Sequence, residues 1–522
     1  MPDIETHMRQ GLVLAEQGRV AEAIEQWQTV LALRPDHVQA HHNLGVAFAQ
    51  LGKPDEGVRC LERALAGKPD YAEACFNLGL VLATQGKKDE GAARYREALR
   101  CKPDYADAYH NLGALLTEMG RAGEAAVFLR QAVRLRPTRD DSHNQLGLAL
   151  EAQGKYADAE ACYQEALRLN PACADAHGNL GNAYQHQGRL EEALACYDVA
   201  LWLQPESAST HWNRALALLQ KGDFERGWRE YEWRWRRKQT PARPLAQPRW
   251  DGKPLANGTI LLYMEQGLGD MLMFIRYAAQ VKERGGTVIV ECPAFLMPLC
   301  SRCRGIDELV AEGTPLPDFD VQAPLMSLPA LLGTTLDTIP ADVPYLFADE
   351  GQVVHWRKEL ASVPNFKIGI VWQGNPHHRL DHWRSIPLRQ FAVLAELRGV
   401  QLISLQHGAG SEQLQACPNV LRLADDLDRD VGGFMGTAAV MQNLDLVISV
   451  DTATAHLAGA LGVPVWVPLS AIGEWRWLLE RNDSPWYPTM RLFRQTKLGE
   501  WDAVFQRIAR EVERLVGCPP LR

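Results

Sequence analysis

The chain has 522 residues, of which 46% are hydrophobic and 23% are charged, and its formal net charge is −9. This length exceeds what one ordinary core accommodates, so several domains are expected. The negative net charge argues against general binding to nucleic acid, and no apolar run reaches the roughly 20 residues that span a membrane.

The amino-terminal residues, "MPDIETHMRQ", lack the apolar core of a secretory signal, so a cytoplasmic location is expected. The eleven cysteines do not suggest a disulfide framework. Several of them fall where small apolar residues pack between helices, which suits a reducing compartment.

A period of 34 residues runs through the first part of the chain. It is kept by six prolines: Pro35, Pro69, Pro103, Pro137, Pro171 and Pro205. Leu-Gly pairs keep the same interval and begin at Leu44, Leu78, Leu112, Leu146 and Leu180. The pattern resembles the tetratricopeptide repeat, in which each helix pair buries its apolar face by stacking on its neighbours. We therefore expect an α-solenoid over residues 4–240, with six full repeats and a degenerate seventh.

The seventh unit, "HWNRALALLQKGDFERGWREYEWRWRR", ends in a cluster of aromatic residues. The cluster consists of Trp228, Tyr231, Trp233 and Trp235. Such residues can form a membrane or ligand surface, or they can seal the end of the solenoid against the next domain. We expect the seal.

One polar position recurs on the first helix of each repeat, just before the Leu-Gly pair. Its occupants are Asn43, Asn77, Asn111, Gln145, Asn179 and Asn213. A primary amide carries both donors and an acceptor, so a column of amides can bind the backbone of an extended peptide. The column resembles the asparagine ladder of the O-linked N-acetylglucosamine transferases, although asparagine is also a common choice at this repeat position. Binding of an acceptor polypeptide in the solenoid groove is expected.

A proline-rich linker at residues 241–257 separates the repeats from a different kind of sequence. Short apolar runs now alternate with helical ones: "TILLYM", "TVIVEC", "KIGIVW", "VQLISLQ", "DLVISV" and "VPVWVPL". Such runs predict parallel strands covered by helices on both faces. They form two sets, at residues 258–350 and 366–515, with a cleft expected at the carboxyl ends of both sheets. We expect the final helix, at about 501–516, to cross back to the first set.

Two strand-to-helix turns carry the candidate chemistry. "MEQGLGDMLMFIRYA" places Gly267, Gly269 and Asp270 where a helix begins, and "VISVDTATAHLAGALGVPVW" places Asp451 and Thr452 at the corresponding point of the second set. A helix start offers backbone N–H groups to an anion, although Gly and Asp also serve as ordinary caps. Together the two stretches resemble the heptosyltransferase-like family of glycosyltransferases. The second motif continues through His456, Ala458, Ala460, Gly462 and Pro464.

The resemblance is closest to bacterial proteins that fuse tetratricopeptide repeats to such a transferase. It implies the GT-B fold, with an acceptor domain at 258–350 and a nucleotide-sugar domain at 366–515. Asp270 is the expected general base and Glu265 the reserve candidate. Thr452 and the helix start would hold the departing diphosphate, so no metal or other cofactor is expected. Asp451 would contact the donor sugar or orient the loop.

Two roles remain open for His456, which either faces the phosphates or packs the helix on the sheet. Further donor-binding candidates follow the strand at 367–372. They are Gly374, Asn375, Arg379, Arg384 and Ser385, whose arginines offer charge-assisted hydrogen bonds to phosphate.

Gln406 ends the strand "VQLISLQ" and is expected near the base or ribose of the donor. Glu474, Trp475 and Trp477 follow the last main strand, where a ring either stacks on a nucleobase or packs in the core. Three histidines follow the strand at 367–372, at positions 377, 378 and 382, and their irregular spacing disfavours a metal site.

The leading hypothesis is a protein glycosyltransferase that moves a sugar from a nucleotide-sugar donor to a Ser or Thr hydroxyl. Similar bacterial fusions modify flagellin, which is therefore the first acceptor to test. One alternative is transfer to lipopolysaccharide or another glycan, with the repeats docking a partner protein. A second alternative is an inactive repeat scaffold that only binds proteins.

Overall fold

The structure is a computed structural model that describes residues 3–238, 240, 243–363, 365–378, 381–423, 427–428 and 433–517. The chain divides into two compact units, Met1–Glu206 and Ser207–Arg522. Of the predicted solenoid at 4–240, the six full repeats fall in the first unit. The seventh helix pair belongs to the second unit, together with both sheets.

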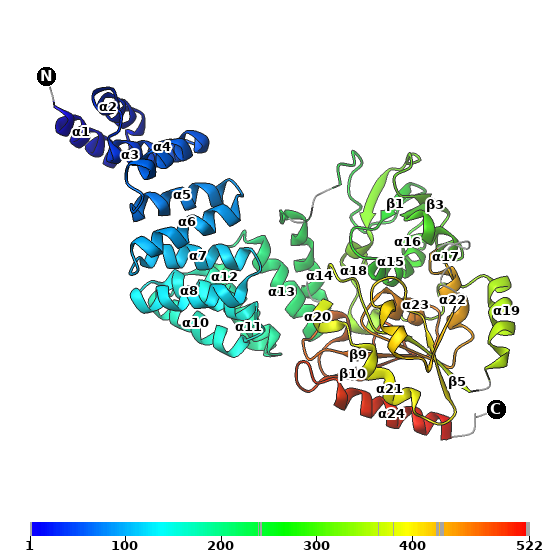
Figure 1. The fold of residues 1–522 in the computed structure, drawn as a ribbon. Helices are drawn as coiled ribbons and strands as arrows, with labels where there is room; N and C mark the ends of the chain where they lie inside the picture. The colour runs from blue at the N-terminus through cyan, green and yellow to red at the C-terminus, as the bar shows by residue number, and fades with distance from the viewer. Residues whose placement is uncertain are drawn as a thin grey trace. The chain divides into compact units, whose positions relative to one another are not determined.

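The first unit consists of antiparallel helix pairs, coloured blue to cyan in Figure 1. The first helices of the pairs are α1 (Ile4–Glu16), α3 (Val38–Gln50), α5 (Ala72–Thr84), α7 (Ala106–Glu118), α9 (Asp140–Glu151) and α11 (Ala174–His186). The second helices are α2 (Val20–Leu33), α4 (Pro54–Gly67), α6 (Lys88–Cys101), α8 (Ala122–Leu135), α10 (Tyr156–Leu169) and α12 (Leu190–Leu203).

Glycine and proline set the limits of these helices. Gly52 has a φ of +72°, which a residue with a side chain rarely adopts. The N–H of Lys53 donates to the Phe48 carbonyl at 2.9 Å, which closes α3 with a Schellman turn. Pro54 then occupies the first position of α4, where its missing N–H costs nothing. The same turn recurs at 34-residue intervals, as the sequence predicts.

The recurring amides all occupy the sixth residue of a first helix, and all are partly buried. The Asn77 side chain contacts His42 of the preceding repeat at 2.9 Å. Asn179 likewise donates to Asn144 of its preceding repeat at 3.0 Å. The Asn43 amide nitrogen is buried without a partner among the described residues. Members of the column therefore contact neighbouring repeats through their amides.

The second unit opens with the seventh helix pair, α13 (Ala208–Lys221) and α14 (Phe224–Tyr231), followed by the 3-10 helix η1 (Glu232–Arg236). Trp228 and Tyr231 are each 1% exposed and lie in the same hydrophobic core as both sheets. The Trp228 ring packs edge-on against Trp475 at 5.2 Å. This packing excludes a membrane surface for these two residues and agrees with the predicted seal.

The first sheet is parallel and has the strand order β3-β2-β1-β4. Its strands are β1 (Thr259–Tyr263), β2 (Thr287–Cys292), β3 (Glu308–Ala311) and β4 (Val321–Pro324). The helices between and after them are α15 (Leu268–Phe274), α16 (Ala278–Lys282), α17 (Met297–Cys300) and α18 (Leu328–Leu331). The connector reaches this sheet at Trp250, whose backbone N–H donates to the Gln322 carbonyl at 2.9 Å.

The second sheet is also parallel, in the order β10-β9-β8-β5-β6-β7. Its strands are β5 (Phe366–Val371), β6 (Val400–Ser404), β7 (Val420–Arg422), β8 (Leu446–Ser449), β9 (Val465–Leu469) and β10 (Met490–Arg494). The accompanying helices are α19 (Glu350–Glu359), α20 (Asp381–Arg384), α21 (Ala392–Ala395), α22 (Met435–Met441), α23 (Ala453–Ala460) and α24 (Asp502–Gly517).

Parallel sheets with helices are thus present in the carboxyl-terminal region, as the sequence predicts. The final helix differs from the expectation. Helix α24, red in Figure 1, packs against α21 and β10 of the second sheet, and the Phe505 ring lies 4.6 Å from that of Phe391. Burial of its apolar face on this sheet explains why it does not return to the first one. Within the described ranges, no helix combines the length and apolarity that crossing a membrane requires.

Candidate active site

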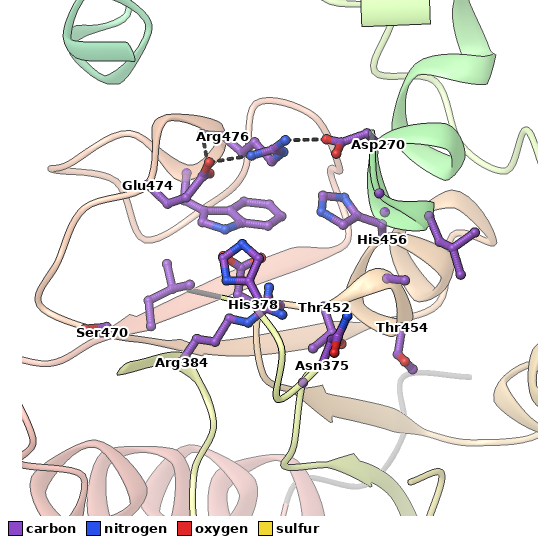
Figure 2. Close-up of a pocket in the computed structure, with 18 of the residues that line it drawn as sticks. Asp270, Asn375, His378, Arg384, Thr452, Thr454, His456, Ser470, Glu474 and Arg476 are labelled. Atoms are coloured by element: carbon purple, nitrogen blue, oxygen red, sulfur yellow. Dashed lines mark hydrogen bonds and ion pairs between the residues drawn. The ribbon is translucent and has the colours of Figure 1, made fainter. Parts of the chain in front are cut away.

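A cleft of about 820 Å³ lies between the two sheets of the second unit. It is lined by the loops that follow the carboxyl ends of β1, β5, β6, β8 and β9. Asp270 from the first sheet and Thr452 from the second open into this one cleft (Figure 2). The predicted lining residues Gly267, Gly269, Gly374, Asn375, Arg384, Gln406, Asp451 and His456 are also present.

The amino terminus of α23 faces the cleft. Thr452 is its N-cap residue, but no side chain caps the helix. The Ala455 N–H donates to the Thr452 carbonyl at 3.0 Å, whereas no backbone hydrogen bond is found among the described residues for the N–H groups of Ala453 and Thr454. Both of these residues line the cleft. Nearby, the Arg384 guanidinium donates to the Asp451 carbonyl at 3.3 Å. A cation and a helix start therefore converge on one part of the cleft, where they favour an anion.

The turn after β5 holds Arg384 in place. A Cβ atom on Gly374 would lie 2.6 Å from the Asp381 carboxylate, so only glycine leaves room here. Asp381 accepts hydrogen bonds from Arg384 at 3.3 Å and from the Ser385 hydroxyl at 2.8 Å. Ser385 in turn accepts from the Gly374 N–H at 2.9 Å. Ser385 therefore supports the turn and does not line the cleft, contrary to the donor-binding role predicted for it.

The remaining candidates near this turn have different positions. Asn375 lines the cleft and accepts from the His377 N–H at 3.0 Å. Arg379 lies outside the described residues. The Gln406 side chain lines the cleft, but its oxygen accepts from the N–H groups of Trp372 and Gln373 at 3.1 and 3.0 Å. Its main visible role is to join β6 to the end of β5.

His456 is 4% exposed and packs α23 on its surroundings. Its Nδ1 atom lies 3.0 Å from the Tyr487 hydroxyl, and its ring stacks on Trp477 at 5.3 Å. Burial lowers the pKa of His456 well below its ordinary value, and the positive charges of Arg476 and Arg276 lower it further. The ring is therefore neutral at physiological pH. It borders the cleft, but it supplies no positive charge to a phosphate.

Asp270 forms an ion pair with Arg476, which also pairs with Glu474 (Figure 2). The backbone N–H of Arg476 also donates to the other carboxylate oxygen of Glu474, at 2.8 Å. Trp475 and Trp477, 5% and 0% exposed, belong to the core of the unit. Glu474, Trp475 and Trp477 are candidates from the sequence, whereas Arg476 between the two tryptophans is not among the predicted site residues. The available signal was the sequence Glu-Trp-Arg-Trp at residues 474–477, in the loop that follows β9.

Glu265, the reserve base, lies outside this cleft. It lines a neighbouring cavity of about 410 Å³, and its side chain is 7% exposed. One oxygen accepts from Arg234 at 2.8 Å, and the other is buried without a partner in the described structure. Burial raises the pKa of Glu265 to about 7, against the opposing effect of Arg234. Its position makes Glu265 a poor partner for a substrate held at α23.

No group of three or more His, Cys, Asp or Glu side chains in the described part of the chain is arranged to hold a metal ion. Of the histidines at 377, 378 and 382, His378 lines the cleft. Its pKa is lowered from the ordinary value by burial and by the nearby Arg384.

Comparison with protein families places repeats in the first unit. A model described as tetratricopeptide repeat matches residues 43–106 and 144–208, and a TPR repeat model matches residues 11–52. A model described as bacterial transcriptional activator domain matches residues 97–171, within the same helical region.

Protein FlbA of Caulobacter vibrioides is 29% identical over 323 residues, which cover 56% of this chain and 53% of FlbA. The chain thus spans about half the length of this curated relative. Because the first unit ends at Glu206, a match of this extent reaches into the second unit.

Similar solved structures include YrrB, described as a TPR protein with an unusual peptide-binding site, at 21% identity and a TM-score of 0.33. This match covers 35% of the present chain and 95% of YrrB. PilF of Pseudomonas aeruginosa matches at 20% identity and a TM-score of 0.37, over 41% of this chain and 96% of PilF. The amino-terminal region is a tetratricopeptide-repeat solenoid, and such repeats point to protein–protein interaction.

Proposed function

We propose that the chain is a glycosyltransferase that moves a sugar from a nucleotide-sugar donor to a Ser or Thr hydroxyl of a polypeptide. One observation carries the proposal. The Asp270 carboxylate, from the first sheet, shares a cleft with Arg384 and the amino terminus of α23, from the second sheet. A base and an anion-binding region thus border one space, where a sugar can lie between them.

In this proposal, the diphosphate of the donor lies against the α23 N–H groups and the Arg384 guanidinium. The acceptor hydroxyl transfers its proton to Asp270, and its oxygen forms a bond to the anomeric carbon. The bond from that carbon to the phosphate oxygen breaks, and the electron pair leaves with the diphosphate. Arg384 and the helix amino terminus stabilise the added negative charge, which is where electrostatic stabilisation is most effective. Asp451 lies beside this region and would contact the donor sugar.

A polypeptide acceptor is favoured over a glycan by the position of α13. Trp212 and Leu216 of this helix line the cleft, and Asn213 of the same helix is the last member of the amide column. Repeat helices of this kind serve protein–protein interaction. A repeat helix that also forms a wall of the cleft provides a surface along which a polypeptide can enter.

Intact-mass analysis of candidate acceptors tests the proposal. Flagellin, the first candidate, should gain the mass of one or more sugars when the gene is present and lose it when the gene is deleted. Complementation with the Asp270→Asn variant should fail to restore the added mass, whereas the wild-type gene should restore it. Acceptors of equal mass in all strains would refute transfer to those proteins. Equal masses combined with an altered glycan would favour the glycan alternative.

A further inference from the structure

Arg476 joins the two halves of the cleft. It belongs to the 3-10 helix η9 (Trp475–Trp477), which follows β9 of the second sheet, whereas Asp270 follows β1 of the first. The arginine pairs with Asp270 through one terminal nitrogen and with Glu474 through the other. Figure 2 shows the guanidinium between the two carboxylates. Arg476 is therefore held at both ends of its fork.

The environment of Arg476 limits its movement. Its side chain is 15% exposed, and the guanidinium carbon lies 4.2 Å from the centre of the Trp475 ring. Burial alone would lower the pKa of Arg476, but the charges of Asp270 and Glu474 outweigh burial and raise it above the ordinary value. The guanidinium is thus always charged, and its hydrogen bonds to carboxylates are of the strong, charge-assisted kind.

The pairing with Asp270 is one-sided. Arg476 binds the Oδ1 atom of Asp270. Among the described residues, no hydrogen bond to Oδ2 is found, and this atom is not enclosed. One carboxylate oxygen is therefore fixed while the other remains available to accept a proton. A rotating carboxylate would present either oxygen in many orientations, whereas this one is restricted.

We propose that Arg476 is the positioning residue for the Asp270 base: it fixes Oδ1 so that Oδ2 faces the acceptor hydroxyl, and Glu474 anchors Arg476 in turn. The inference rests on the proposed function. The proton passes from the hydroxyl to Oδ2 while the hydroxyl oxygen replaces the nucleotide on the sugar, and the nucleotide departs with the electron pair of the broken bond. Because Arg476 belongs to the donor half, the base is oriented only when both halves are together.

The test uses the full chain and measures nucleotide release with water as the acceptor. The donors are UDP- and GDP-activated sugars, whose leaving group is a diphosphate, and CMP-activated sugars, whose leaving group is a monophosphate. Arg476→Gln should lower kcat at least about tenfold, because a misplaced base loses its orientation, and should leave the KM for the donor within about threefold. Arg476→Lys keeps the charge without the fork, so it should recover only part of the rate. Glu474→Gln should show a smaller loss of kcat. Arg481→Gln is the matched control, because Arg481 pairs with Asp483 at 2.6 and 2.9 Å outside the cleft.

A double variant shows whether Arg476 acts by positioning Asp270 or contributes to the reaction independently of it. If Arg476 acts through Asp270, adding Arg476→Gln to Asp270→Asn should cause no further loss of kcat. A further loss equal to that in the wild-type background would overturn the proposal. A rise in KM with unchanged kcat would do the same, because Arg476 would then bind the donor.

Failure of the proposed function would appear differently, as no nucleotide release from any activated sugar by the wild-type chain. The pairing between Asp270 and Arg476 is then decided by the melting temperatures of four proteins: the wild type, Arg476→Gln, Asp270→Asn and the double variant. Losses that do not add would support the fixed Asp270–Arg476 pair, and additive losses would refute it.

Discussion

A Cβ atom on Gly269 would lie 2.9 Å from the Cδ2 atom of His456 and 3.5 Å from the Cα atom of Ala453. The turn after β1 therefore touches the start of α23, and the two halves of the cleft meet at a glycine. Asp270 is the next residue along the chain. This contact sets how closely the proposed base approaches the region that would hold the diphosphate.

Gly269→Ala should force α15 and α23 apart, because the buried His456 ring has little room to move. We expect a loss of about 1–3 kcal/mol in the free energy of unfolding, typical of overpacking. We also expect a lower rate of nucleotide release. Gly267→Ala is the matched control, since its added Cβ would meet only the Asp270 carboxylate, at 3.7 Å. Urea unfolding of both variants tests the contact, and nucleotide release by Gly269→Ala is compared with that of the wild type. Equal behaviour of the two variants would contradict it.

Asp270→Asn should lower transfer by about 10²–10⁴-fold, the usual contribution of a general base. The amide retains the size of the carboxylate, so the donor should bind with nearly unchanged affinity. Calorimetric titration with the nucleoside diphosphate product measures that affinity. Glu265→Gln, made in parallel, tests the reserve candidate. A large loss of rate in Glu265→Gln with a normal rate in Asp270→Asn would reverse the two assignments.

The strands that the sequence predicts are the inner ones. The six predicted strands are β1, β2, β5, β6, β8 and β9, and each lies between two neighbours. The four missed strands, β3, β4, β7 and β10, are the edges of the two sheets. An inner strand is covered on both faces and both sides, so its sequence is a continuous apolar run. An edge strand such as Glu308–Ala311 is short and partly exposed, and its pattern is correspondingly weak.

The features of the candidate site also divide into those that the sequence predicts and those that it does not. Turns that follow inner strands could be located from sequence, which is why Asp270, Arg384 and Thr452 were found together. The partners of individual side chains could not be located. Ser385 and Gln406 are placed near the cleft by sequence position, but both accept hydrogen bonds from backbone N–H groups at the end of β5 and in the turn that follows it. Such pairings depend on tertiary contacts, which one sequence does not contain.

The amide column provides a prediction about the acceptor. Replacing Asn43, Asn77, Asn111 and Asn179 with Ala should weaken binding of the acceptor polypeptide, because backbone groups of the peptide would lose their hydrogen-bond partners. Nucleotide release with water as acceptor should stay at the wild-type rate. Gln28→Ala and Gln164→Ala, at exposed amides on the second helices α2 and α10, are the controls. Fluorescence anisotropy with a labelled acceptor measures affinity. Unchanged affinity in the column variant would exclude this role.

Glu265 should give the protein a measurable pH dependence of stability. Its pKa is about 7 in the folded chain, above the ordinary value of 4.5, because it is buried. The folded state therefore holds a proton that the unfolded state releases between these two values, so this group makes stability fall as pH rises from 4.5 to 7. In Glu265→Gln this dependence should disappear. The unfolding free energy of the variant, relative to wild type, should rise by about 3 kcal/mol across that range.

Chemical unfolding of both proteins at pH 4.5, 6 and 8 measures the effect. Gln keeps the size of Glu and can still accept a hydrogen bond from Arg234. The pH dependence of the stability difference between variant and wild type therefore reports the protonation of Glu265 and not the loss of a contact. Glu350→Gln, at a residue whose side chain is 92% exposed, corrects for the general effect of removing one negative charge. A constant difference between Glu265→Gln and wild type at all three pH values would mean that Glu265 is ionised throughout. In that case its pairing with Arg234 would outweigh burial.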